Sequence, residues 1–311
     1  MTFRSTSFRT SLATACVLAA LPIAGCNMQA FAADQAGGIA AKSVDRMRGF
    51  WDYEIAGQGN AAGIMQLESL YGFSPENEDL ALVLCASYVG YGFGWVEVLA
   101  EKAEDAGDYD NAARQRHRAE LLYTRARDIA LTVMRNRDDG IDEALKAKPA
   151  QLKAYLAEHY EDPEDVAPLF WAAASWGALM SMSEDLSLAM DLPAILALVE
   201  RVIALDEGYE GAGALVFLGG FNAQFPAQFG GSPAKAKEYF ERALKITGRR
   251  AHQVQLNYAR FYAVTMNDKA LYVSLLDEII KAPDQGRDVR LANKIARIRA
   301  ELLLSKVDQI F

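Results

Sequence analysis

The pattern of apolar and polar positions predicts helices along almost the whole chain. Beyond the first forty residues there is no sustained alternation of apolar and polar residues, and no Asn-Gly turn joins two apolar runs, so strands are not predicted. The strong helix formers Ala, Leu, Glu, Lys and Arg dominate this region. Helix starts are marked by a capping residue before proline at Ser74-Pro75, Asp162-Pro163 and Ser232-Pro233. Helix ends are marked by Gly107, Gly140, Gly208 and Gly248. The predicted helices span approximately residues 42–71, 76–105, 109–135, 150–159, 164–182, 193–205, 210–223, 233–247, 250–266, 268–281 and 287–306.

Two of these helices carry the spacing of small and aromatic residues that is typical of tetratricopeptide repeats, in which helix pairs stack. A small residue is followed by an aromatic residue four positions later and by a second small residue three positions further on. This spacing occurs at Ala236, Phe240 and Ala243, and again at Ala119, Tyr123 and Ala126. The stretches 199–206 and 272–279 match it more loosely. We therefore predict an all-α fold, with degenerate tetratricopeptide-like helical-hairpin repeats forming a compact solenoid with extra flanking helices.

The first 25 residues have the pattern of a secretory leader. Arg4 and Arg9 precede an apolar run, residues 11–24, that is too short to cross the ~30 Å hydrocarbon core of a bilayer. The run ends in the four residues of a bacterial lipobox, Ile23, Ala24, Gly25 and Cys26. The first three form the recognition site for the signal peptidase, and the Cys26 thiolate would accept a diacylglyceryl group. The chain is thus predicted to be a lipoprotein that incorporates palmitate. An ordinary leader cut near residues 30–32, which would remove Cys26, is the alternative.

The predicted organisation has three parts: the leader at residues 1–25, a flexible lipid-anchored tether at residues 26–40, and a helical domain at residues 41–311. The tether is expected because its residues are small and polar and include Gly37-Gly38. Asn27, rather than Asp, follows Cys26, which favours a periplasmic location at the outer membrane. Cys85 lies in an apolar helical stretch and is predicted to be buried and inert.

Charge and motifs exclude several functions. With 41 acidic and 32 basic residues the net charge is −9, which argues against a nucleic-acid partner. The sequence contains no His-Glu-x-x-His, no Cys-x-x-Cys and no phosphate-binding loop, so we predict no enzyme, no metal and no cofactor. The glycines in residues 57–63 lack the spacing and the preceding strand of a dinucleotide loop. The acidic residues in 138–143 are interpreted as a loop between helices, because calcium loops need a different spacing.

Aromatic residues form several clusters, and one of them, residues 88–95, alternates glycine with large rings. Each glycine inside a helix costs ~1 kcal/mol relative to Ala, so the alternation calls for a reason. Close approach of helices would supply one, and an apolar cavity walled by rings would supply another. Core packing is the alternative for every cluster. The candidate tunnel or ligand-lining residues are Trp51, Tyr88, Tyr91, Phe93, Trp95, Trp171, Trp176, Phe221, Phe225 and Phe229.

Four stretches in fixed order resemble a known family. They are residues 170–177 (FWAAASWG), residues 192–206, residues 229–244 (with FGG followed by FERAL), and residues 291–311, which close on Phe311. The chain is similar to the T component associated with tripartite ATP-independent periplasmic (TRAP) transporters, a family of lipoproteins with degenerate tetratricopeptide repeats. The residues of the last stretch also fit an amphipathic helix with Leu291, Ile295, Ile298 and Leu302 on one face.

The resemblance implies a periplasmic lipoprotein that forms a homotrimer, with a tunnel through each protomer. It further implies a partner, the solute-binding protein of a TRAP transporter, and a role in passing a small apolar ligand to or from that protein. Only Cys26 is carried over from the family at the level of a residue. The alternative function is a general repeat scaffold, a lipoprotein that mediates protein–protein interactions in cell-envelope assembly.

Overall fold

A computed structural model describes residues 28–311, which form helices and no strand. The all-α prediction is therefore confirmed for this part of the chain. The α-helices are α1 (Met28–Arg48), α2 (Tyr53–Phe73), α3 (Glu78–Tyr91), α4 (Glu97–Asp105), α5 (Tyr109–Arg137), α6 (Ile141–Leu145), α7 (Pro149–His159), α8 (Val166–Met182), α9 (Leu192–Asp206), α10 (Tyr209–Gln224), α11 (Pro233–Ile246), α12 (His252–Asn257), α13 (Lys269–Lys281), α14 (Arg290–Ser305) and α15 (Val307–Ile310). Two π-helical segments, η1 (Gly92–Val96) and η5 (Tyr258–Ala263), and three 3₁₀ segments, η2 (Pro163–Asp165), η3 (Leu186–Asp191) and η4 (Ala227–Phe229), complete the chain.

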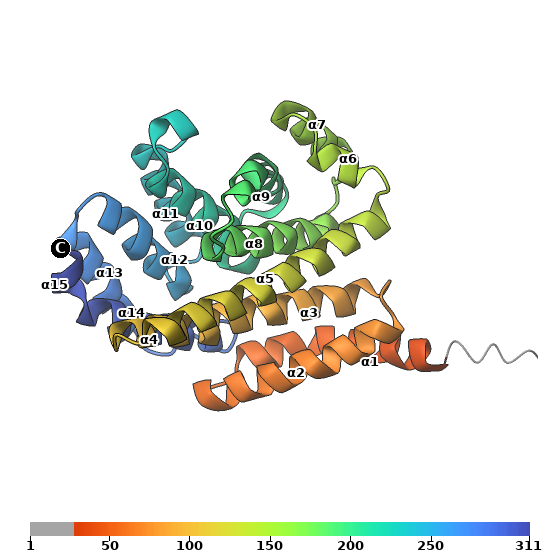
Figure 1. Ribbon diagram of the computed structural model, residues 1–311, viewed down its shortest axis with the longest axis horizontal. Coiled ribbons are helices and arrows are strands. Elements are labelled where there is room, and N and C mark those ends of the chain that lie inside the picture. The colour runs from red at the N-terminus through yellow and green to blue at the C-terminus, as the bar shows by residue number, and fades with distance from the viewer. Residues whose placement is uncertain (1–27) are drawn as a thin grey trace, which may run out of the picture.

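The helices stack in layers (Figure 1). α1 and α2 form the outermost layer, α3 and α5 lie on it, and α8 and α9 follow. The C-terminal helices, α10 to α15, form the other end of the molecule, with α10 packed on α11 and α13 on α14. One apolar core runs through α3, α5, α8 and α9, and a second one lies among α10 to α14.

The N-terminal part of the chain differs from the prediction of a flexible tether at residues 26–40. From Met28 onward this segment is helical and continues as α1 to Arg48. Ala33 and Gly37 are buried on the side of α1 that faces the body, where Gly37 approaches Leu80. Asp34 accepts a hydrogen bond from the amide of Asn77 at 2.9 Å. Glycine pairs are typical of linkers, but here the missing side chain at Gly37 allows α1 to dock on α3.

The predicted helix at residues 42–71 is divided between α1 and α2. The break falls at residues 49–52, and Asp52 caps α2 by accepting a hydrogen bond from the amide of Ile55. Residues 1–27 lie outside the described part of the chain, and with them the predicted leader, its recognition site (Ile23, Ala24, Gly25) and Cys26.

The central helical stretch, Glu78–Asp105, joins α3, η1 and α4 without a break. Among the described residues, this is the one helical stretch long and apolar enough to cross a membrane. The mean hydropathy of its most apolar 18 residues is 1.5. It lies inside the body, however, with α2, α5 and α8 packed against it. Glu97 within it is buried. We interpret this stretch as the core helix of the domain.

The two clear matches to the repeat pattern mark packing positions. The six matching residues are all fully buried: Ala119, Tyr123 and Ala126 on α5, and Ala236, Phe240 and Ala243 on α11. Phe240 shows what the spacing achieves, because its ring lies against the backbone of Gly219 on α10. A Cβ atom at Gly219 would come within 2.8 Å of that ring. The small residue thus allows α10 and α11 to approach closely; the number of repeats stays a prediction.

Gly219→Ala is expected to destabilise the protein by about 1–3 kcal/mol, because the buried Phe240 ring has no room to move away from the new methyl group. Gly63→Ala on α2 is the matched control, since nothing lies within 4 Å of its Cβ position. This control should be neutral or stabilising by up to about 1 kcal/mol, owing to the higher helix propensity of Ala. Urea unfolding followed by circular dichroism measures both. Equal midpoints for the two variants would contradict the packing argument.

Candidate functional site

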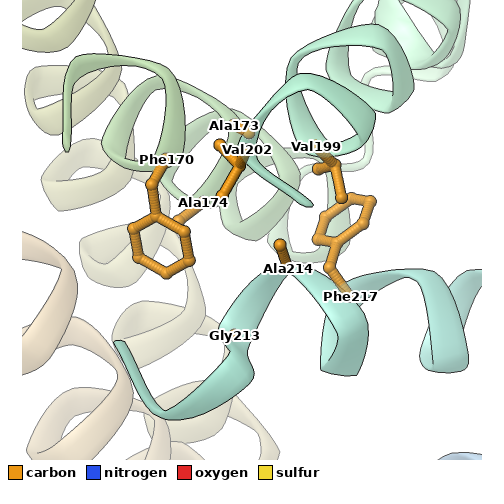
Figure 2. A pocket seen from close by; sticks show the side chains of 8 residues that line it. All are labelled: Phe170, Ala173, Ala174, Val199, Val202, Gly213, Ala214 and Phe217. Carbon is orange, nitrogen blue, oxygen red and sulfur yellow. The ribbon is translucent and has the colours of Figure 1, made fainter. Parts of the chain in front are cut away.

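An apolar cavity lies between α8, α9 and α10 (Figure 2). Its volume is about 50 Å³. A buried water needs about 10–15 Å³ of such space, so the cavity holds the equivalent of a few small groups. The lining side chains are those of Phe170, Ala173, Ala174, Val199, Val202, Ala214 and Phe217, with the backbone of Gly213. No charged residue is among them, so the cavity suits an apolar group.

The shape of the cavity follows from small residues under two rings. The Phe170 ring lies over Gly213, where a Cβ would come within 2.8 Å, and the Phe217 ring lies over Gly177, where it would come within 2.3 Å. A left-handed turn precedes Gly213: Glu210 and Ala212 have φ values of 47° and 61°. Such values are unfavourable for residues with a side chain. The turn redirects the chain after α9 so that the regular part of α10 begins at the cavity.

The ring cluster at residues 88–95 lies where α3 runs through η1 into α4. Trp95 stacks on Tyr53 of α2 at 5.2 Å between ring centroids and donates from Nε1 to the Tyr53 carbonyl at 3.1 Å. It also stacks on Tyr91 at 6.0 Å. The Tyr88 hydroxyl donates to Glu68 at 2.8 Å. Burial raises the pKa of the Tyr53 hydroxyl to about 12, so this group stays neutral and donates to the Gly94 carbonyl at 2.7 Å.

Close approach explains two glycines of this cluster, Gly92 and Gly94, whereas nothing lies within 4 Å of the Cβ position of Gly90. A Cβ at Gly92 would come within 2.7 Å of the Tyr123 ring, and one at Gly94 would come within 2.9 Å of Ile295. On α2, the Trp95 indole lies 2.3 Å from the Cβ position of Gly57. The sequence left two explanations open, and at these three positions the structure shows close approach: a ring meets the backbone at Gly92 and Gly57, and an isoleucine meets it at Gly94.

The other predicted lining residues lie in separate places. Trp51 is exposed in the loop between α1 and α2, and Phe229 is exposed on η4. Trp176 is buried and donates to Asp191 at 3.0 Å. Phe221 and Phe225 contact each other at 4.8 Å. Trp171 meets Phe170 edge-on at 5.1 Å between ring centroids.

Two pairs of the ten predicted residues are in ring contact, Tyr91–Trp95 and Phe221–Phe225. The ten residues do not line one common cavity. The cavity between α8, α9 and α10 is lined by none of them. Sequence reasoning missed Phe170 and Phe217. The available signal was the run of small residues at 211–214, which a ring on a neighbouring helix can approach.

A buried ion cluster lies beside the ring cluster. Arg299 of α14 is 0% exposed and donates to Glu97 of α4 at 3.0 Å. It also pairs with Glu101 and donates to the Phe93 carbonyl at 2.9 Å, with its guanidinium 4.1 Å from the Phe93 ring centroid. Arg260 of η5 lies 3.5 Å from Glu101. Two cations therefore face two carboxylates, so the cluster is balanced in charge.

The pKa shifts of Arg299 and Tyr123 keep the first group charged and the second neutral. Burial lowers the pKa of Arg299, but the neighbouring carboxylates of Glu97 and Glu101 outweigh it and hold the pKa above its ordinary value. Burial, and then the charge of Glu97, raise the pKa of the Tyr123 hydroxyl well above its usual range. Tyr123 is thus a neutral donor to Glu97. A balanced cluster of this kind positions the helices that contribute to it.

Other groups with chemical potential are dispersed. Cys85 is buried, as predicted; its thiol donates to the Ala126 carbonyl at 3.3 Å, and burial raises its pKa. The three histidines, at positions 117, 159 and 252, lie on different helices. Within residues 28–311, no group of three or more His, Cys, Asp or Glu side chains is placed to hold a metal ion.

The fold and the site therefore define a helical protein with a packed core and a small apolar cavity. A family model described as TRAP transporter T-component matches residues 51–311. Because the match covers most of the chain, the protein belongs to this family and is an accessory component of a TRAP transporter. The family is not a known enzyme family. No curated protein sequence matches the chain.

Arg299→Leu is expected to cost about 3–5 kcal/mol of stability, because it removes the buried partner of Glu97 and leaves two carboxylates facing one cation, Arg260. Arg297→Leu, two positions away on the same helix, is the control. Arg297 forms an exposed pair with Glu301, which contributes at most about 1 kcal/mol. The shift of the urea midpoint at neutral pH checks both values. Similar small shifts in the two variants would rule out a stabilising role for the cluster.

Proposed function

We propose that this protein binds the periplasmic solute-binding protein of its TRAP transporter. The observation that carries the proposal is the family match over residues 51–311. An accessory component outside the membrane has to meet the transporter through the part that carries the solute. The layered helices support the proposal by offering a large rigid surface, which is how helical-repeat proteins bind their partners.

We further propose that the protein receives a small apolar ligand, and that it works as a homotrimer with a passage through each protomer. The cavity between α8, α9 and α10 supports an apolar ligand, because rings and methyl groups form its wall. The left-handed turn beside it supports a special role for this region, since strained backbone clusters at functional sites. Because the cavity wall is apolar, the part of the ligand that enters it is expected to be apolar and uncharged.

The protein is proposed to be held in the periplasm by acyl chains on Cys26, at the outer membrane. The lipobox residues Ile23, Ala24 and Gly25 before Cys26 support this proposal. Each buried methylene contributes about 0.8 kcal/mol to membrane binding, and stable anchoring takes more than one chain. A diacylglyceryl group meets that requirement.

Crosslinking in intact cells followed by pull-down should recover a TRAP solute-binding protein as the dominant partner, because the family places the protein in that transporter. Mass spectrometry identifies the partner. Native mass spectrometry of the gently purified protein checks the trimer and any retained apolar molecule. A strict monomer with no ligand, or a pull-down dominated by envelope-assembly proteins, would favour the general scaffold instead.

Cys26→Ser should abolish the incorporation of radiolabelled palmitate and leave the protein in a soluble fraction or unprocessed, since the acceptor thiol is gone. Cys16→Ser is the matched control, because Cys16 lies inside the predicted leader. This control should incorporate palmitate normally. Unchanged labelling of Cys26→Ser would show that the anchor is elsewhere or missing.

A further inference from the structure

The outward face of α1 carries an unusual combination of residues. The buried residues Ala33 and Gly37 turn one side of α1 toward the body. The opposite side is an exposed stripe at spacings of three and four residues. We call it the α1 stripe, and it consists of Met28, Phe31, Ala32, Gln35, Ile39, Lys42 and Arg46. Phe31 is 63% exposed and Ile39 is 66% exposed.

The charge of the stripe is opposite to that of the chain. Lys42 and Arg46 are exposed, and within the described part of the chain they form no ion pair. The stripe itself contains no acidic residue; Asp45 lies on its flank, and Asp34 turns toward Asn77. The whole chain, in contrast, has 41 acidic and 32 basic residues. A positive, partly apolar face on an acidic protein suits a surface that is negative and apolar.

The position of α1 places this face next to the proposed acyl attachment. α1 begins two residues after Cys26, so its first turn lies within about 7 Å of the proposed acyl attachment. The helix is docked on α3 and on α2, so its orientation also orients the body. In Figure 1, α1 and α2 form the outer edge of the molecule, with the other layers stacked on one side. Nothing between Cys26 and α1 is long enough to hold the body away from the lipid.

We propose that the α1 stripe lies on the surface of the anionic bilayer to which the protein is anchored. Phe31 and Ile39 enter the boundary between headgroups and acyl chains, and Lys42 and Arg46 contact lipid phosphates. Interfacial helices combine these two kinds of residue in the same way. α1 from Met28 to Arg46 is about 27 Å long, so the contact extends well beyond the anchor itself. The inference rests on the proposed lipidation of Cys26.

Single labels at two positions test the orientation. In the acylated full-length protein, Cys85 is buried, so Ile39→Cys and Leu186→Cys each offer one reactive thiol. Leu186, on η3, is 88% exposed and serves as the control for exposed apolar positions. Each variant carries an environment-sensitive NBD fluorophore and is bound to vesicles of phosphatidylethanolamine and phosphatidylglycerol that contain doxyl-labelled lipid. The emission of the label at position 39 should shift to shorter wavelength and be quenched by the doxyl groups. The emission of the label at position 186 should remain that of a fluorophore in water.

A second arm tests the charges. Lys42→Gln combined with Arg46→Gln should reduce the quenching at position 39 on these vesicles and have little effect on vesicles of phosphatidylcholine. The matched control, Lys237→Gln combined with Lys245→Gln, removes two exposed charges from α11 and should leave the quenching unchanged. Equal losses in both double variants would show that net charge alone matters and would overturn the assignment of these two residues.

The outcomes separate this inference from the anchor. If the protein does not float with the vesicles, the Cys26 anchor fails and the membrane contact fails with it. If it floats but position 39 is as exposed to water as position 186, the anchor stands and the α1 contact is wrong. If position 39 is shielded in solution without vesicles and is not quenched by doxyl lipid, a second copy of the chain covers the stripe, which also overturns the inference.

Discussion

The ion cluster around Arg299 is the contact on which the arrangement of the domain depends. It joins the last long helix, α14, to the central stretch α3–η1–α4, although more than 190 residues separate them in sequence. The charges are buried, and burying a charge is unfavourable unless it is paired and hydrogen-bonded. Because Arg299 is the partner that Glu97 and Glu101 share, their pairing fixes the position of α14 relative to the core helix.

Rings packed on glycines set the distances between the helices. Phe240 on Gly219, Phe170 on Gly213 and Tyr123 on Gly92 are three examples in different parts of the molecule. When a ring packs directly on the backbone of a glycine, two helices can lie closer together than when side chains from both helices separate them. Where rings and glycines do not fill the space completely, between α8, α9 and α10, the apolar cavity remains. The same packing rule thus produces both the solid core and the candidate site.

The geometry agrees with an accessory protein of a transporter. The charged groups in the core are balanced, and the cavity carries no polar group that could act on a substrate. In the proposed function, such a protein acts through its surfaces, by holding a partner and a membrane in a fixed relation. In this arrangement, α1 would face the lipid while the layers beyond it face the periplasm and the transporter.

The sequence by itself determined the helices and the packing positions with local signals. Asp162-Pro163 and Ser232-Pro233 marked true helix starts, whereas Asn77 rather than Ser74 caps α3. The repeat spacing identified Tyr123 and Phe240 as core residues, because such signals act within one or two turns of the chain. The sequence did not predict the N-terminal half of α1, because its small residues are typical of a linker. They form a helix that packs on α3, and this contact is not visible in the sequence. The predicted apolar face of α14 is less buried than its neighbour: Leu291, Ile298 and Leu302 are half-buried, whereas Asn293, Ala296 and Arg299 are buried together with Ile295. Hydrophobic periodicity cannot find a buried arginine, because its carboxylate partners come from a distant helix. The tertiary structure alone decided which glycines meet rings, where the cavity lies and which face of α1 is left outside, since each of these depends on two segments that meet only in the folded chain.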